Sequence, residues 1–182
     1  MAKYVALLRG INVGGKNKIS MPLLKAAFEA AGFADVKTYI NSGNILFRAD
    51  CEDTAILQKR CRKLIADTFQ LDILTAVFSA EEYADAINHA PFWWGSNTES
   101  KHNAIFVIEP AATATVIETV GETKPEYEQT AAYGHVIFWS APIKTFTKTR
   151  WSKVVSAGAL YNSITIRNAN TAKKLLLLLE DE

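Results

Sequence analysis

The first half of the chain alternates between short apolar runs and segments whose apolar residues recur every three or four positions. The apolar runs, typical of buried strands, occupy 4–8, 36–40, 45–47 and 73–78. The helical pattern occupies 20–32, which ends at Gly32, and 56–69. Between the second and third runs, the cluster Asn41-Ser42-Gly43-Asn44 favours a tight turn, because Gly43 can adopt a positive φ. The order predicts a β-α-β-β-α-β unit.

The second half repeats this order of elements. Ser79 and Glu82 fit a capping box, and the small, polar segment 95–101 after the helix they start is the best candidate linker. The elements that follow are expected at 103–108, 112–120, 127–133, 136–139, 151–160 and 164–167. A last helix follows, for which Asn170 is the expected N-cap.

Two such units predict an α+β protein, a tandem duplication of a ferredoxin-like βαββαβ unit with helices packed on antiparallel sheets. The expected domains are 1–95, which includes the connecting helix, and 102–182, which includes the terminal helix. Because lobes of this size are near the limit of independent stability, we expect them to pack together as one unit.

Composition narrows the classes of function. The 182 residues carry a formal net charge of +1, which argues against a general polyanion binder but allows a local anion pocket. Neither Cys51 nor Cys61 belongs to a Cys-x-x-Cys pair, so both are interpreted as reduced thiols. The three histidines show no metal-ligand spacing, and no metal site is expected. The chain shows no signal-peptide pattern and no apolar run near the roughly 20 residues of a membrane span, so the cytoplasm is the expected location.

The segment from Arg9 to Lys18 has the strongest candidate chemistry. Three glycines stand among three cations, a combination that suits a phosphate, sulfate or carboxylate group. It is not a nucleotide-binding P-loop, because Asn17 stands where that motif needs a metal-binding serine or threonine. Two interpretations stay open: an anion site, or a mobile glycine loop with solvated lysines.

Three further segments are candidates. The 41–44 cluster is either a turn chosen for its backbone or a set of amide groups beside the glycine loop. The stretch 144–153 interleaves basic and aromatic residues, as in nucleic-acid sites, or is an ordinary loop and helix start. The polar segment 167–171 lies at a strand-to-helix junction, where Arg167 could bind an anion or form a structural ion pair. No nucleophile elbow or catalytic constellation is recognisable, so the sequence specifies neither a reaction nor a cofactor.

The segments 6–17 and 38–44 together resemble the opening of the bacterial family called domain of unknown function 1697. The resemblance returns at Ser152-Lys153 and at 167–171. The family implies cytoplasmic bacterial proteins of this length with a tandem α+β architecture, and it assigns no reaction, cofactor or substrate. Its signature positions map onto Arg9, Gly10, Asn12, Gly15, Lys16, Asn41, Ser42, Gly43, Asn44, Lys153, Arg167, Asn168, Asn170 and Thr171. Where the family usually has tryptophan, this chain has Ala169, which implies an altered or enlarged pocket if the indole lines one in relatives.

The leading hypothesis is a cytoplasmic binding protein for a small anionic or phosphate-bearing ligand at the Arg9–Lys18 loop. The predicted ligand-binding residues are Arg9, Asn12, Gly14, Gly15, Lys16, Asn41, Ser42, Asn44, Lys153, Arg167, Asn168 and Asn170. One alternative is an undescribed enzyme that acts on a phosphorylated metabolite or nucleotide by electrostatic stabilisation. The other is a nucleic-acid-binding module that uses 144–153.

Overall fold

A computed structural model describes residues 1–50 and 53–181, so Cys51 lies outside the described residues. The chain forms two compact units, Met1–Ala84 with Leu175–Glu182, and Asp85–Lys174. The first unit is therefore discontinuous in sequence, because its last segment comes from the far end of the chain. The sequence had placed the division at 95–102.

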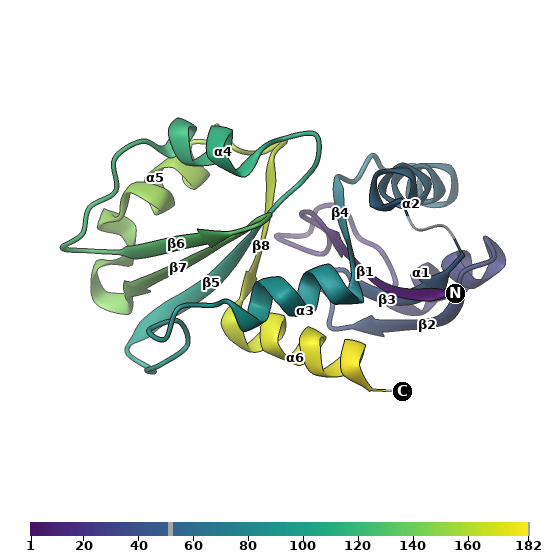
Figure 1. Ribbon diagram of the computed structural model, residues 1–182. Helices are drawn as coiled ribbons and strands as arrows, with labels where there is room; N and C mark the ends of the chain where they lie inside the picture. The colour runs from purple at the N-terminus through teal and green to yellow at the C-terminus, as the bar shows by residue number, and fades with distance from the viewer. Residues whose placement is uncertain (51–52, 182) are drawn as a thin grey trace. The chain divides into compact units, whose positions relative to one another are not determined.

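The first unit is a four-stranded sheet with two helices. Its elements are β1 (Ala2–Leu8), α1 (Met21–Ala30), β2 (Ala34–Tyr39), β3 (Asn44–Ala49), α2 (Thr54–Phe69) and β4 (Thr75–Ser79). The strands lie in the order β2-β3-β1-β4, and each neighbouring pair is antiparallel. This arrangement confirms the predicted βαββαβ order (Figure 1).

The core of the first unit lies between the sheet and its helices. Alternate residues of β1, including Tyr4 and Leu8, share one buried cluster with Phe28 of α1 and Cys61 of α2. The Phe33 and Phe47 rings meet edge to face, with centroids 4.7 Å apart. α1 and α2 therefore cover the same face of the sheet (Figure 1).

The second unit repeats the plan with added helices. Its elements, with the helices that cross the division, are α3 (Ala80–Asn88), β5 (Ser100–Val107), α4 (Thr113–Val120), β6 (Gln129–Tyr133), β7 (Val136–Pro142), the 3₁₀ helix η1 (Ile143–Lys148), α5 (Arg150–Ser156), β8 (Ile164–Asn168) and α6 (Ala169–Glu180). The strand order is β6-β7-β5-β8, again antiparallel throughout. Ile105, Val116, Trp139 and Trp151 form the centre of its core under α4 and α5. The protein is thus an α+β protein of two similar units.

Helix ends show where the sequence pattern held and where it did not. The capping box at Ser79 is confirmed, because the Ser79 N–H donates to Glu82 Oε2 at 3.0 Å and the Glu82 N–H donates to Ser79 Oγ at 3.1 Å. Asn170 as the N-cap of the last helix is wrong. Asn168 takes this role, since its Oδ1 accepts from the Thr171 N–H at 2.8 Å. None of the described helices has the length and apolar character that crossing a bilayer requires.

Candidate functional site

The glycine loop of the first unit ends in a tight turn. The Lys16 N–H donates to the Val13 carbonyl at 3.0 Å, and Gly14 and Gly15 both have positive φ, +57° and +76°. Two consecutive positive φ values are the signature of a hairpin turn that glycine favours. The N–H groups of Gly14 and Gly15 donate to no described part of the chain. The tip of the loop thus presents two adjacent amide donors to solvent.

Asn12 holds the base of this loop. Its Nδ2 donates to the Ile19 and Asn41 carbonyls, each at 3.0 Å, and its Oδ1 accepts from the Ile19 N–H at 2.9 Å. Both ends of the Asn12 amide are therefore used within the protein, and they fasten the glycine loop to the 41–44 turn. The structure brings these two predicted segments together.

The 41–44 turn is built to pack closely against the loop. Gly43 has φ +85°, and a Cβ there would lie 2.7 Å from Leu8 Cβ and 2.8 Å from Ile11 Cδ1. Asn44 is fully buried, and its Nδ2 donates to the Tyr39 carbonyl at 2.9 Å and to Ser42 Oγ at 3.0 Å. Ser42 and Asn44 therefore shape the turn.

The side chains that stay available at the loop are cationic or amide groups. Lys16, Lys18 and Asn41 are exposed, and their side chains bond to no described group. Arg9 is half-buried at the end of β1, and its N–H donates to the Leu74 carbonyl at 2.8 Å. Neither the loop nor the 41–44 turn contains an acidic residue. The electrostatics of this surface favour an anion.

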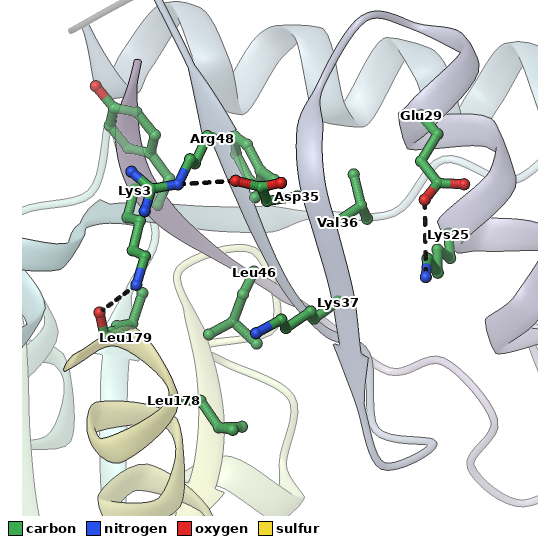
Figure 2. A pocket seen from close by; sticks show the side chains of 12 residues that line it. Lys3, Lys25, Glu29, Asp35, Val36, Lys37, Leu46, Arg48, Leu178 and Leu179 are labelled. Atoms are coloured by element: carbon green, nitrogen blue, oxygen red, sulfur yellow. Dashed lines mark hydrogen bonds and ion pairs between the residues drawn. The ribbon is translucent and has the colours of Figure 1, made fainter. Parts of the chain in front are cut away.

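A second feature of the first unit is a groove of about 450 Å³, which no sequence pattern indicated (Figure 2). It lies at the β2 edge of the sheet, where the pairing of β2 with β3 shifts register between Ala34 and Lys37. Figure 2 shows its acids facing cations: Arg48 Nε lies 3.0 Å from Asp35 Oδ2, and the Lys25–Glu29 pair spans 3.7 Å. The two acids that line the groove, Asp35 and Glu29, are therefore both paired with cations.

The predicted residues of the second unit lie in three different places. Arg167 is only 6% exposed, and its Nη1 donates to Thr165 Oγ1 and to the Ile166 carbonyl, both at 2.9 Å. Asn168 and Asn170 line a polar groove of about 580 Å³, whose other walls come from 95–98, 100–103 and Ala169. Ala169, which is 4% exposed, is one of the residues that line this groove. The position where the family usually has tryptophan therefore does line a hollow. Lys153 is not among the lining residues and lies on α5.

The aromatic residues of 144–153 turn inward. Trp151 is 1% exposed, and the Phe146 ring packs on Trp139 with centroids 4.8 Å apart. Lys101 lies over the Phe146 ring at 4.4 Å, and Lys148 lies 5.8 Å from the Tyr127 ring. The segment therefore offers cations but little aromatic surface for stacking bases.

A histidine–serine contact was also missed, because the two residues are 38 positions apart. His102 and Ser140 pair across β5 and β7, with His102 Nδ1 2.6 Å from Ser140 Oγ and Nε2 2.9 Å from the Asn97 carbonyl. Because one imidazole nitrogen faces Ser140 and the other faces a backbone carbonyl, His102 links the two strands to the 95–98 segment. The described residues include no cluster of histidine, cysteine or acidic side chains able to hold a metal ion.

Two ferredoxin-like units, the first with a glycine loop fastened to an Asn-Ser-Gly-Asn turn, define the class: a tandem α+β protein with an open polar loop. The family described as "Protein of unknown function (DUF1697)" matches residues 1–138, and the chain belongs to this family. The solved structure of a conserved bacterial protein from Streptococcus pneumoniae is similar, with 30% identity over 98% of this chain and 99% of that chain and a TM-score of 0.88. No curated protein matches the chain.

Proposed function

We propose that this is a cytoplasmic protein that binds a small anionic or phosphate-bearing ligand at the Arg9–Lys18 loop. The observation that carries the proposal is the pair of unbonded N–H groups at Gly14 and Gly15, set next to two exposed lysines. Successive amides in a glycine turn form a concavity that suits an oxyanion.

Each neighbouring residue has a role in this proposal. Lys16 and Lys18 supply charge, and Asn41 supplies an amide donor. Asn12 keeps the loop in its bound shape through its three internal hydrogen bonds, which lowers the entropy lost on binding. The near-zero net charge favours a small ligand over a polyanion.

The test is a thermal-shift screen with inorganic phosphate, sulfate, nucleotides and sugar phosphates. It compares wild type with Lys16→Ala/Lys18→Ala and with a control, Lys59→Ala/Lys63→Ala, which removes two exposed lysines from α2 of the same unit. A ligand at about a hundred times its Kd adds roughly 2.7 kcal/mol of stability, a rise of several degrees in Tm. We expect the rise in wild type and control only. A rise of equal size in all three proteins, or none in any, would refute the proposal.

A further inference from the structure

One buried carboxylate organises the start of α5 in the second unit. Glu128 is 4% exposed, and its Oε1 accepts from the N–H groups of Lys124 at 3.0 Å and Arg150 at 2.8 Å. Its Oε2 accepts from the Trp151 N–H at 3.3 Å. Because Lys124 and Arg150 donate to the same oxygen, their backbones are held side by side. The carboxylate itself is used by backbone groups and hidden from solvent.

This arrangement brings three cations together. Arg150 and Lys153 are three residues apart on α5 and so lie on one side of the helix, beside Lys124. The Arg150 guanidinium is fixed, since its Nε donates to the Val120 carbonyl at 2.6 Å and its Nη2 lies over Gly121. The pKa of Lys153 is lowered mainly by the nearby charge of Lys124, with the charge of Arg150 as the smallest of the contributions.

In the described part of the chain, the exposed carboxylates that flank this cluster in sequence are not paired with it. Glu122 and Glu126 flank Lys124 in sequence, yet among the described residues neither forms an ion pair with Lys124, Arg150 or Lys153. Cations held close together repel one another, and an oxyanion placed between them removes the repulsion. Arginine adds two terminal nitrogens with the geometry to hold two oxygens of one phosphate group.

We propose that Lys124, Arg150 and Lys153 form a second oxyanion site, which binds one phosphate-type group. The site belongs to the second unit and shares no residue with the Arg9–Lys18 loop. The ring of Trp151 is 1% exposed and so cannot stack on a base beside this site.

The test measures binding of inorganic pyrophosphate by calorimetry, with a short single-stranded RNA as a second arm. The variant is Lys124→Ala/Lys153→Ala, and the matched control is Lys144→Ala/Lys174→Ala, which removes two exposed lysines of the same unit. We expect the variant to weaken pyrophosphate binding roughly tenfold or more, as for loss of a charged hydrogen bond, and the control to bind as wild type does. Unchanged affinity in the variant overturns the proposal.

Two further readouts separate this site from its alternatives. Lysine NMR should show a pKa for Lys153 below the ordinary lysine value in anion-free buffer, and pyrophosphate should raise it. Lys16→Ala/Lys18→Ala should leave that rise intact; if it abolishes all binding, the second site does not exist. RNA binding without pyrophosphate binding also overturns the proposal, because the surface would then follow a nucleic-acid backbone and not hold a single group.

Discussion

Replacing Gly43 by alanine tests the close approach between the 41–44 turn and the glycine loop. An added methyl group would lie 2.7 Å from Leu8 Cβ and 2.8 Å from Ile11 Cδ1, and both of these side chains are fully buried. Neither neighbour can swing into solvent, so the core must deform, at a cost of about 1–3 kcal/mol. The φ of +85° adds about 1–2 kcal/mol for any residue with a Cβ. The expected loss in free energy of unfolding is therefore about 2–5 kcal/mol.

Gly32 provides the matched control. It has a φ of +87° in the same unit, and a Cβ there meets nothing within 4 Å. Gly32→Ala should therefore lose only the backbone contribution of about 1–2 kcal/mol. Urea unfolding of both variants, followed by circular dichroism, gives the difference. If both variants lose the same free energy of unfolding, Gly43 is not packed as closely against Leu8 and Ile11 as the structure shows.

Three other changes have defined outcomes. Asn12→Ala leaves the Ile19 carbonyl, the Ile19 N–H and the Asn41 carbonyl without their side-chain partner. It should lower the free energy of unfolding, measured in urea, by about 1–3 kcal/mol. An unchanged free energy of unfolding would mean that these hydrogen bonds are not needed to hold the loop. Burial raises the pKa of Cys61 to about 12. Iodoacetamide at pH 8, followed by mass spectrometry, should therefore modify Cys61 in urea but not in the native protein. Rapid modification of the native protein would contradict this. The hydrogen bond from Arg62 lowers the pKa of Asp72, so the pair stabilises the fold above the ordinary carboxyl pKa and loses this effect as pH falls through the lowered value. Because both side chains are largely exposed, Arg62→Ala should cost below about 1 kcal/mol at pH 7 and nothing in strong acid; an equal loss at both pH values would exclude the ion pair as its source.

The elements were predictable because each is set by neighbours in sequence. The apolar run 4–8 and the stripes of α1 and α2 gave their strand and helices within a few residues of the observed bounds. The start of α6 was missed because Asn168 and Asn170 are both good N-cap residues, and only the backbone path decides between them. The 3₁₀ helix was missed because Phe146, which anchors it to the core, stands in a run that otherwise looks solvated.

The site was less predictable, because its contacts join residues far apart in the chain. Sequence alone brought out the glycine loop and the 41–44 turn, but not that Asn12 joins them across 29 positions. The same holds for Glu128, which lies within the expected strand 127–133 and accepts a hydrogen bond at the start of α5 from 22 residues away. Long-range hydrogen bonds produce no periodic pattern in the sequence. The spacing of residues therefore could not distinguish side chains that shape a loop from side chains that face a ligand.

The discontinuity of the first unit has a consequence for how the protein is made. Lys3, near the start of β1, bonds through Nζ to the Leu179 carbonyl at 3.2 Å, although the two residues are 176 positions apart in the chain. Residues 1–84 therefore emerge without the segment that completes their unit, which begins at Leu175. At about 5–20 residues per second, synthesis from residue 84 to residue 175 takes roughly 5–18 s, and for this time the nascent first unit lacks its last segment. During that interval its apolar surface is available to chaperones, and a stop codon before Leu175 would leave it permanently incomplete.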